Sequence, residues 1–259
     1  MTISIVIPTL DEERSLSPTL THTAGLGFDE VIVVDGGSRD RTRDIVAQFD
    51  VRRKKFEVSS SPPSNLEPQT SNSAGTSNFE PRTHIKLLTA PPGRAPQMNA
   101  GAAASRGDVL LFLHADTLLP RDARLAIEGA LEDPACVGGR FDVRFGRDSR
   151  PGRLIGRMIN LRSRCTGIAT GDQAIFVRRA VFERLGRFSD IPIMEDVDFT
   201  RRLKRAGRVV ALRSQVVTSY RRWDACGPIR TILLMWVLRL LYWIGVSPGT
   251  LSRFYSTVR

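Results

Sequence analysis

Acidic side chains stand at the ends of several short apolar runs of the chain. Glu12 follows the first run, Asp35 closes a second run and precedes two glycines, and His114 and Asp116 follow a later run, LLFL. A fixed carboxylate can accept hydrogen bonds from a nucleobase or a ribose, and beside phosphates it usually holds a hard divalent cation. Taken one at a time, these segments are equally typical of turns and helix caps.

A second acidic cluster opens the segment EDVDFTRRLKRAG. Glu195, Asp196 and Asp198 stand at its start, and its basic residues gather towards its end. This charge order complements a helix dipole and is typical of a stable surface helix. The adjacent carboxylates also suit a general base, because the preceding apolar IPIM and the like charge both raise a pKa. The residues alone leave both interpretations open.

Polar side chains that suit phosphate or base recognition lie in the segment GRAPQMNAG. Arg94 can reach a phosphate or a base edge, and Gln97 and Asn99 offer amide hydrogen bonds. Ordinary capping of a helix end explains Gln97 and Asn99 equally well.

The elements that must position these residues alternate between short β-branched runs and helical stretches, which predicts βαβ units and a parallel sheet. The continuous apolar character of the runs predicts a sheet covered on both faces. Thr9 and Glu12 have the spacing of a capping box, and Gly107, Gly186 and Gly207 each follow an expected helix end. The strands are expected at 4–7, 31–34, 85–88 and 109–113, and the helices from 16, over 42–49 and over 96–105.

The composition is that of a globular α/β chain of about one domain. It has 259 residues, 41% of them apolar, and 38 Lys and Arg against 27 Asp and Glu give a net charge of +11. Global disorder and a collagen-like fibre are excluded. The three separated cysteines and three histidines offer neither a disulfide scaffold nor a zinc cluster, and a cytosolic compartment without an export signal is expected. The basic excess fits nucleic acid, anionic lipid or a phosphate-bearing substrate.

Two segments depart from the alternating pattern. Residues 52–83 are rich in Ser, Asn and Pro, and we expect a disordered surface insertion there rather than a functional lid. Ile229–Val246 is almost wholly apolar, but Arg239 interrupts it, which disfavours a transmembrane span. Its helix either packs on the domain or also meets a membrane through Trp236, Tyr242 and Trp243. We therefore expect a domain over 1–227 and an apolar helical extension over 228–259.

The order of the motifs carries more information than any one of them. VIPTLDEE, VVDGGSRDRT, GRAPQMNAGA, LFLHADT, TGDQAIFVRR, MEDVDF and RRW follow one another along the chain. Together they resemble the family 2 glycosyltransferases of the GT-A fold, over nearly the whole chain except the insertion. The sequence is similar in particular to a bacterial branch named for radical-SAM and selenodomain-associated or arsenosugar gene neighbourhoods. The resemblance implies a Rossmann-like, mainly parallel sheet with flanking helices.

The resemblance also implies roles for individual residues. Asp116 would hold a divalent cation, Mg²⁺ or Mn²⁺, as the final Asp of a D-x-D motif whose first Asp is His114 here. Asp196 would be the inverting base. RRW resembles a motif of processive members without its Gln, so processive synthesis is not expected. The nucleotide pocket would be lined by Pro8, Thr9, Glu12, Asp35, Gly36, Arg94 and Asn99, the acceptor side by Gly171, Asp172, Gln173 and Glu195, and the diphosphate by Arg221 and Arg222.

The expected activity is metal-dependent, inverting transfer of a sugar from a UDP- or GDP-linked donor to an acceptor hydroxyl. The expected location is the cytoplasm, with peripheral contact to an anionic membrane at the inner face of the plasma membrane. A nucleotidyltransferase is the nearest rival, but the first loop, PTLDEE, lacks the Gly-rich basic character it needs. A more distant rival is a non-enzymatic basic module that binds nucleic acid or anionic membranes. The strand-end carboxylates would repel a phosphate backbone, so no nucleic-acid partner is expected. The base, the sugar and the acceptor do not follow from the sequence.

Overall fold

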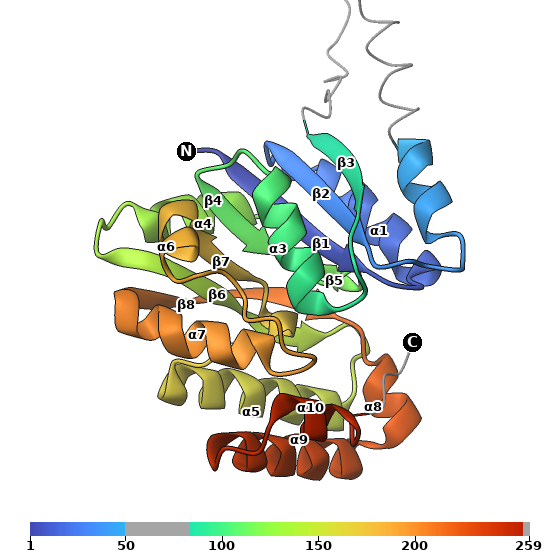
Figure 1. Ribbon diagram of the computed structural model, residues 1–259, viewed down its shortest axis with the longest axis vertical. Helices are drawn as coiled ribbons and strands as arrows, with labels where there is room; N and C mark the ends of the chain where they lie inside the picture. The colour runs from blue at the N-terminus through green and yellow to red at the C-terminus, as the bar shows by residue number, and fades with distance from the viewer. Residues whose placement is uncertain (50–82, 256–259) are drawn as a thin grey trace, which may run out of the picture.

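One curled sheet runs through the protein, with helices on both of its faces (Figure 1). The computed structural model describes residues 1–49 and 83–255. In this part of the chain the eight strands are ordered β3-β2-β1-β4-β7-β6-β8-β5. Their bounds are β1 Ile3–Thr9, β2 Glu30–Asp35, β3 His84–Thr89, β4 Val109–Phe112, β5 Thr117–Leu118, β6 Cys136–Phe145, β7 Ile175–Arg178 and β8 Arg208–Thr218.

The predicted parallel sheet is confirmed for its first half. β3, β2, β1 and β4 are mutually parallel neighbours, and all four expected strands form at the expected places. The direction then changes, because β7 runs antiparallel to both β4 and β6. β8 is parallel to β6, and the short β5 is antiparallel to β8. The sheet is therefore mixed, and its parallel half carries the strand ends of interest.

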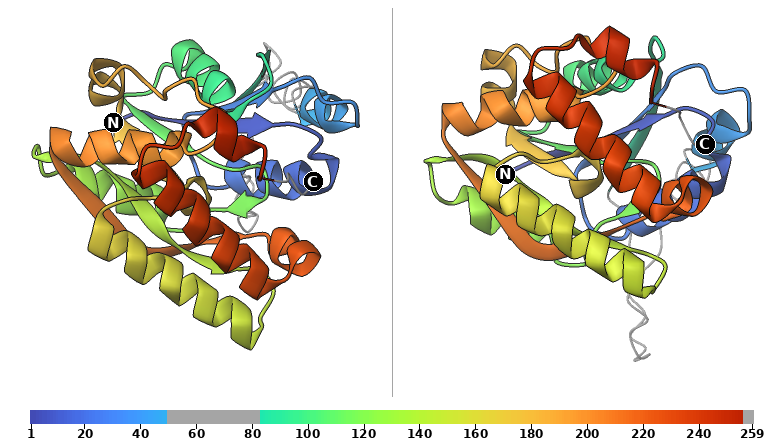
Figure 2. Two further views of the ribbon diagram at one scale, coloured as in Figure 1. Left: turned by 60° about the horizontal axis from the view of Figure 1, so that its bottom comes forward. Right: turned by 90° about the horizontal axis from the view of Figure 1, so that it is seen from below.

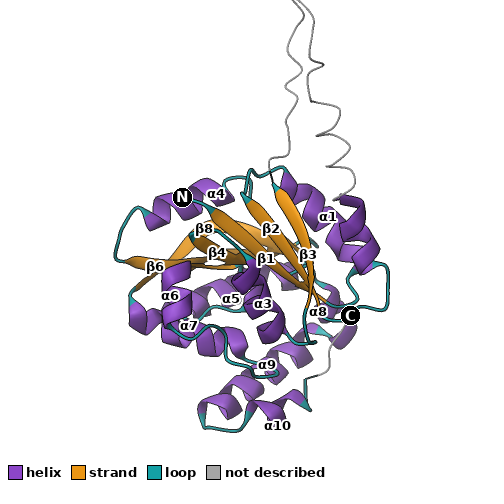
Figure 3. Ribbon diagram, turned by 45° about the horizontal axis from the view of Figure 1, so that its top comes forward, coloured by secondary structure: helices purple, strands orange, loops and turns teal. Residues whose placement is uncertain are grey.

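The helices cover both faces, as Figure 3 shows. Alternate strand residues divide between two cores: α1, the helical residues 42–49 and α4 pack on one face, while α3, α6 and α7 pack on the other. This division confirms the expected two-sided burial. The helices are α1 Glu13–Ala24, α3 Arg94–Ala104, α4 Ala123–Leu131, α5 Arg150–Thr166, α6 Arg179–Arg184, α7 Glu195–Ala206, α8 Arg221–Cys226, α9 Pro228–Trp243 and α10 Pro248–Ser252.

The predicted capping box at the start of α1 is wrong. Thr9 is the last residue of β1, and its hydroxyl donates to the Val34 carbonyl instead. The first N–H groups of α1 are satisfied from the neighbouring loop: Glu12 N donates to Thr42 Oγ1 at 2.8 Å, and Glu13 N to Asp40 Oδ2 at 3.0 Å. The helix therefore starts where two loops meet, a tertiary arrangement that local spacing does not reveal.

The remaining expectations about helix ends and unusual segments have mixed outcomes. Gly186 and Gly207 follow the ends of α6 and α7, as predicted, and Gly107 comes shortly after α3. The expected insertion lies outside the described residues, apart from Thr83. The apolar C-terminal segment forms α9, and within the part of the chain that is described no helix is long and apolar enough to span a membrane.

The close packing of α3 on the sheet leads to a stability prediction. A Cβ on Gly101 would lie 2.4 Å from Val6 Cγ1 and 2.9 Å from Val34 Cγ2, whereas a Cβ on Gly129 in α4 would meet no atom within 4 Å. We expect Gly101→Ala to lower the free energy of unfolding by about 1–3 kcal/mol. Gly129→Ala should raise it by up to about 1 kcal/mol, because Ala favours a helix. Urea unfolding measures both, and equal effects would contradict this packing.

Candidate active site

The polar strand ends meet at one edge of the sheet. Thr9 at the end of β1 pairs in register with Asp35 at the end of β2, which pairs with Thr89 at the end of β3. Because these strands are parallel, the loops that follow them leave from the same edge. Ligands of open α/β sheets bind at such an edge.

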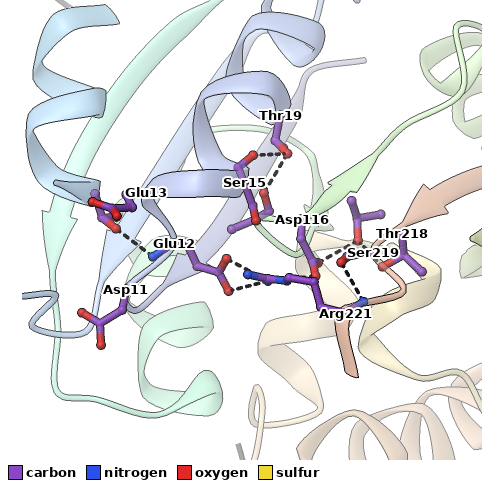
Figure 4. Close-up of polar contacts among 12 residues, drawn as sticks. Asp11, Glu12, Glu13, Ser15, Thr19, Asp116, Thr218, Ser219 and Arg221 are labelled. Carbon is purple, nitrogen blue, oxygen red and sulfur yellow. Dashed lines mark hydrogen bonds and ion pairs between the residues drawn. The ribbon is translucent and has the colours of Figure 1, made fainter. Parts of the chain in front are cut away.

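Glu12, Asp116 and Arg221 form the Arg221 cluster, shown in Figure 4. Arg221 Nη2 donates to Glu12 at 3.0 Å (Oε2) and 3.2 Å (Oε1) and to Asp116 Oδ2 at 3.2 Å. All three side chains are partly exposed, Arg221 at 33%. The single guanidinium of Arg221 thus pairs with two carboxylates at a position that solvent can reach.

Strand pairing explains why these distant residues meet. Thr117 of β5 pairs with Thr218 of β8, and their hydroxyls are hydrogen-bonded at 3.0 Å. Asp116 comes just before this pair and Arg221 just after it, so the short β5 fixes both. Burial raises the pKa of the Glu12 carboxyl, and the Arg221 guanidinium opposes that rise.

Asp116 fits only part of a divalent-cation site. Among the described residues no group of three His, Cys, Asp or Glu side chains could hold a metal ion. The Asp116 side chain is 22% exposed, however, so its carboxylate is accessible to a cation. Mg²⁺ typically uses one or two carboxylates and takes its other ligands from water and substrate phosphates. The residues therefore fit a cation whose coordination a bound diphosphate completes.

His114, Gly171, Glu195 and Asp196 form a second group, the Asp196 cluster. Asp196 Oδ2 accepts the Gly171 N–H at 2.7 Å, and Oδ1 accepts the Val197 N–H at 2.7 Å. A carboxylate has about four lone-pair sites, so each oxygen can take another partner. A Cβ on Gly171 would lie 2.4 Å from His114 Nε2, so the loop backbone packs directly on the ring. A small hollow here is lined by Met98, Phe112, His114, Gly171, Ile175, Phe188, Glu195 and Asp196.

The backbone is held in unusual conformations on both sides of this cluster. Met194, directly before Glu195, has φ 69°, and Ala174, directly after Gln173, has φ 47°. Non-glycine residues in the left-handed region cost on the order of 1 kcal/mol and gather at functional sites. The strain is consistent with carboxylates held in place by their surroundings.

Glu195 has an environment that favours its neutral form. Its side chain is almost fully buried at the start of α7, and Arg94 Nη1 lies 3.7 Å from Oε1. Burial and then the adjacent Asp196 charge raise the pKa of Glu195 to about 7, while Arg94 opposes the rise. Near neutral pH a substantial fraction of Glu195 is therefore protonated and uncharged beside Asp196.

This pKa predicts a pH dependence of stability. Between pH 4.5 and about 7 the unfolded chain releases the Glu195 proton while the folded protein keeps it, so the free energy of unfolding falls as pH rises. Glu195→Gln should remove a decline on the order of 2 kcal/mol across this window. Urea unfolding from pH 5 to 8 tests it, with the exposed Glu132→Gln as a control that follows wild type. Parallel curves for wild type and Glu195→Gln would refute the assignment.

The expected nucleotide-pocket residues are only partly brought together. Pro8, Thr9 and Gly36 lie at the adjoining ends of β1 and β2, with Gly36 N donating to the Thr9 carbonyl at 2.9 Å. Asp35 is fully buried and accepts from Gly37 N and Ser38 N at 3.1 and 3.2 Å, so it organises its own loop. Glu12 belongs to the Arg221 cluster instead.

Arg94 and Asn99 lie on α3 and have polar partners outside these strand ends. Arg94 faces Glu195 and also hydrogen-bonds to the Tyr255 side chain, which places it beside the Asp196 cluster. The Asn99 amide pairs with the Phe188 backbone, donating to the carbonyl at 2.9 Å and accepting its N–H at 3.0 Å. Asn99 therefore anchors the loop before α7.

The expected acceptor and diphosphate residues have distinct surroundings. Gln173 is fully buried and accepts the Thr170 N–H at 3.2 Å, so it supports its loop. Asp172 Oδ1 is buried and has no hydrogen-bond partner among the described residues. Arg222 lies over the Tyr255 ring, 3.9 Å from its centroid.

Two residues of the site region were not assigned a role from the sequence. From the sequence, ligand recognition and helix capping explain Gln97 equally well. Its side-chain amide donates to both the Thr9 and Val34 carbonyls at 2.7 Å and so joins β1 to β2. Tyr255 contacts both Arg94 and Arg222 from the C-terminal segment. No local pattern around Tyr255 indicates this contact.

Comparisons with known proteins identify the family of the chain. Residues 4–65 and 70–186 match the sequence model described as Glycosyl transferase family 2. The probable glycosyltransferase YdaM of Bacillus subtilis is 27% identical over 230 residues, which are 79% of this chain and 47% of that protein. The undecaprenyl-phosphate 4-deoxy-4-formamido-L-arabinose transferase of Pseudomonas paraeruginosa is 29% identical over 207 residues, 74% of this chain and 52% of that one. The chain thus spans about half the length of these relatives.

The fold is also that of solved glycosyltransferases. The mannosyltransferase PcManGT of Pyrobaculum calidifontis, solved with GDP-Man and Mn²⁺, superposes with a TM-score of 0.62 at 18% identity, over 99% of this chain and 65% of that one. The sheet and its helices therefore form a GT-A fold, as expected. The chain belongs to glycosyl transferase family 2.

Proposed function

We propose that the protein is an inverting, metal-dependent glycosyltransferase that moves a sugar from a UDP- or GDP-linked donor to an acceptor hydroxyl. The observation that carries this proposal is the placement of two clusters around one segment. Asp116 belongs to the Arg221 cluster, and His114, two residues earlier, belongs to the Asp196 cluster. This placement supports a cation and diphosphate site beside Asp196, a half-buried carboxylate suited to proton removal.

The residues divide the chemistry between them. Asp196, oriented by Gly171 and Val197, would take the acceptor proton as the acceptor oxygen attacks the anomeric carbon of the donor. Arg221, with Arg222 nearby, would stabilise the departing diphosphate. Asp116 would hold Mg²⁺ or Mn²⁺, which when bound neutralises charge on the diphosphate. Asp172, Gln173 and Glu195 would form the acceptor side, and Pro8, Thr9, Asp35 and Gly36, with Glu12, Arg94 and Asn99, the nucleotide side.

Several finer assignments belong to the same proposal. The Mn²⁺ and GDP-Man of the PcManGT structure support a nucleotide-sugar donor and a cation here. The order of the motifs supports membership of the radical-SAM and selenodomain-associated branch. We assign catalysis to residues 1–227 and an accessory role to 228–259, in a cytoplasmic enzyme peripheral to the inner face of the plasma membrane. The lipid-phosphate acceptor in the Pseudomonas relative's name supports this location.

Calorimetric titration with UDP, GDP and their common sugar conjugates, with and without Mn²⁺, tests the proposal. We expect one nucleotide and its conjugates to bind, and to bind more tightly with Mn²⁺. Heat from none of them, at protein concentrations that detect millimolar affinity, would remove the donor assignment.

A further inference from the structure

An apolar stripe lies exposed along α9. Its members recur every three or four residues, which places them on one side of the helix, while Thr231 and Leu238 are buried on the other. Trp243 is 75% exposed and Trp236 60%. Tyr242, which one of the two interpretations of the sequence places at a membrane, packs inward instead. The stripe consists of Ile229, Leu233, Trp236, Val237, Leu240 and Trp243 of α9, and of Ile244 directly after it.

The neighbouring helix α5 widens this stripe into a face. Leu154, Met158 and Leu161 are exposed along α5 with the same spacing. The two helices are joined through an apolar cluster that contains Ile155 of α5 and Ile232 of α9. Seen from below, in the right view of Figure 2, α5 and α9 lie side by side on the outside of the protein. We call these exposed side chains together the α5–α9 face.

Positive charge accompanies the apolar side chains. α5 contains five arginines and α9 two, and neither helix contains an Asp or Glu. Arg150, Arg157 and Arg230 are exposed. Tryptophan and arginine beside an apolar stripe are typical of helices that lie in the headgroup region of anionic membranes. A symmetric dimer through this face would bring the arginines of two copies together, which disfavours a second copy as its occupant.

We propose that the α5–α9 face docks flat onto an anionic lipid bilayer. The 16 residues of α9 give a rod of about 24 Å, long enough to lie in the interface. Its inner side packs on Ile193 and Met194, the residues directly before Glu195 and Asp196. Docking therefore holds the Asp196 cluster about one helix diameter, roughly 10 Å, from the lipid. If the proposed transferase function holds, the acceptor hydroxyl reaches Asp196 from the bilayer surface.

Vesicle flotation of the full chain tests the docking. We expect binding to vesicles of phosphatidylcholine with one third phosphatidylglycerol, and much weaker binding to phosphatidylcholine alone or in high salt. Leu233→Glu and Trp243→Ser should each lower the partition coefficient at least about tenfold. Leu125→Glu, on α4 and 73% exposed, is the matched control and should bind as wild type. Arg157→Glu should weaken binding, and the exposed Arg121→Glu should not.

Three results would overturn the proposal. These are no binding to the anionic vesicles, equal binding by wild type and Leu233→Glu, and a dimer at working concentration that Leu233→Glu dissociates. Nucleotide titration of the same Leu233→Glu sample separates this test from the proposed function. Retained nucleotide binding with lost vesicle binding supports docking through this face. If the wild-type protein binds no nucleotide, that result contradicts the transferase assignment and leaves the docking proposal unaffected.

Discussion

Asp196→Asn should slow sugar transfer by about 10²- to 10⁴-fold while donor affinity stays within about twofold. An amide keeps the size of the side chain and can still accept the Gly171 N–H, but it cannot take the acceptor proton. The rate of nucleoside diphosphate release from the donor found by titration measures the first effect, and calorimetry the second. The expected signature is a loss of turnover without a loss of binding.

The matched control for this variant lies two residues further along α7. Asp198 is also a carboxylate in the first turn, but Arg202 Nη2 holds it at 2.7 Å. Asp198→Asn should therefore keep most of the transfer rate. Full activity in Asp196→Asn would remove this residue from the base role, and equal losses in both variants would indicate damage to the helix start instead.

Asp116→Asn should lower Mn²⁺-dependent donor affinity at least about tenfold. The neutral amide cannot hold a divalent cation as the carboxylate does, while Glu12 still pairs with Arg221 and keeps the loop in place. Titration of the variant with the donor, in Mn²⁺ and in chelator, measures the loss as a difference between the two conditions.

The control for Asp116 is the same change at an exposed carboxylate. Asp44, within the helical residues 42–49, is exposed, so Asp44→Asn should bind donor as wild type does. If Mn²⁺ strengthens donor binding equally in Asp116→Asn and wild type, the cation is held elsewhere. That result would leave Asp116 as a partner of Arg221 only.

The sequence predicts the parallel half of the fold well, because strands buried on both faces must be apolar throughout. Ile5, Val33 and Leu111 are such residues, and their strands form where the apolar runs predict. The reversal at β7 is not visible in the same way. Its residues Ile175–Arg178 are as apolar as a parallel strand would be, and the direction depends on non-local pairing with β4 and β6.

The sequence predicts which residues belong to the site better than it predicts the partners of their side chains. Residue types and order predict roles for Asp116 and Asp196, and the structure places each of them in a polar cluster. The partners of polar side chains are set by tertiary contacts: Arg221 meets Glu12 from the other end of the chain, and Asn99 meets the Phe188 backbone. Motif position alone cannot separate a residue that faces a ligand from one that anchors a loop.

The contact between Gly171 and His114 has a consequence for how such sites can change in evolution. Because a methyl group on Gly171 would meet the imidazole, position 171 cannot carry a larger residue while His114 keeps its place. A relative with a larger residue in place of Gly171 must carry a smaller one in place of His114, or have displaced the loop that orients Asp196. His114, at the first position of the expected D-x-D motif, thus fits this loop only while position 171 is glycine.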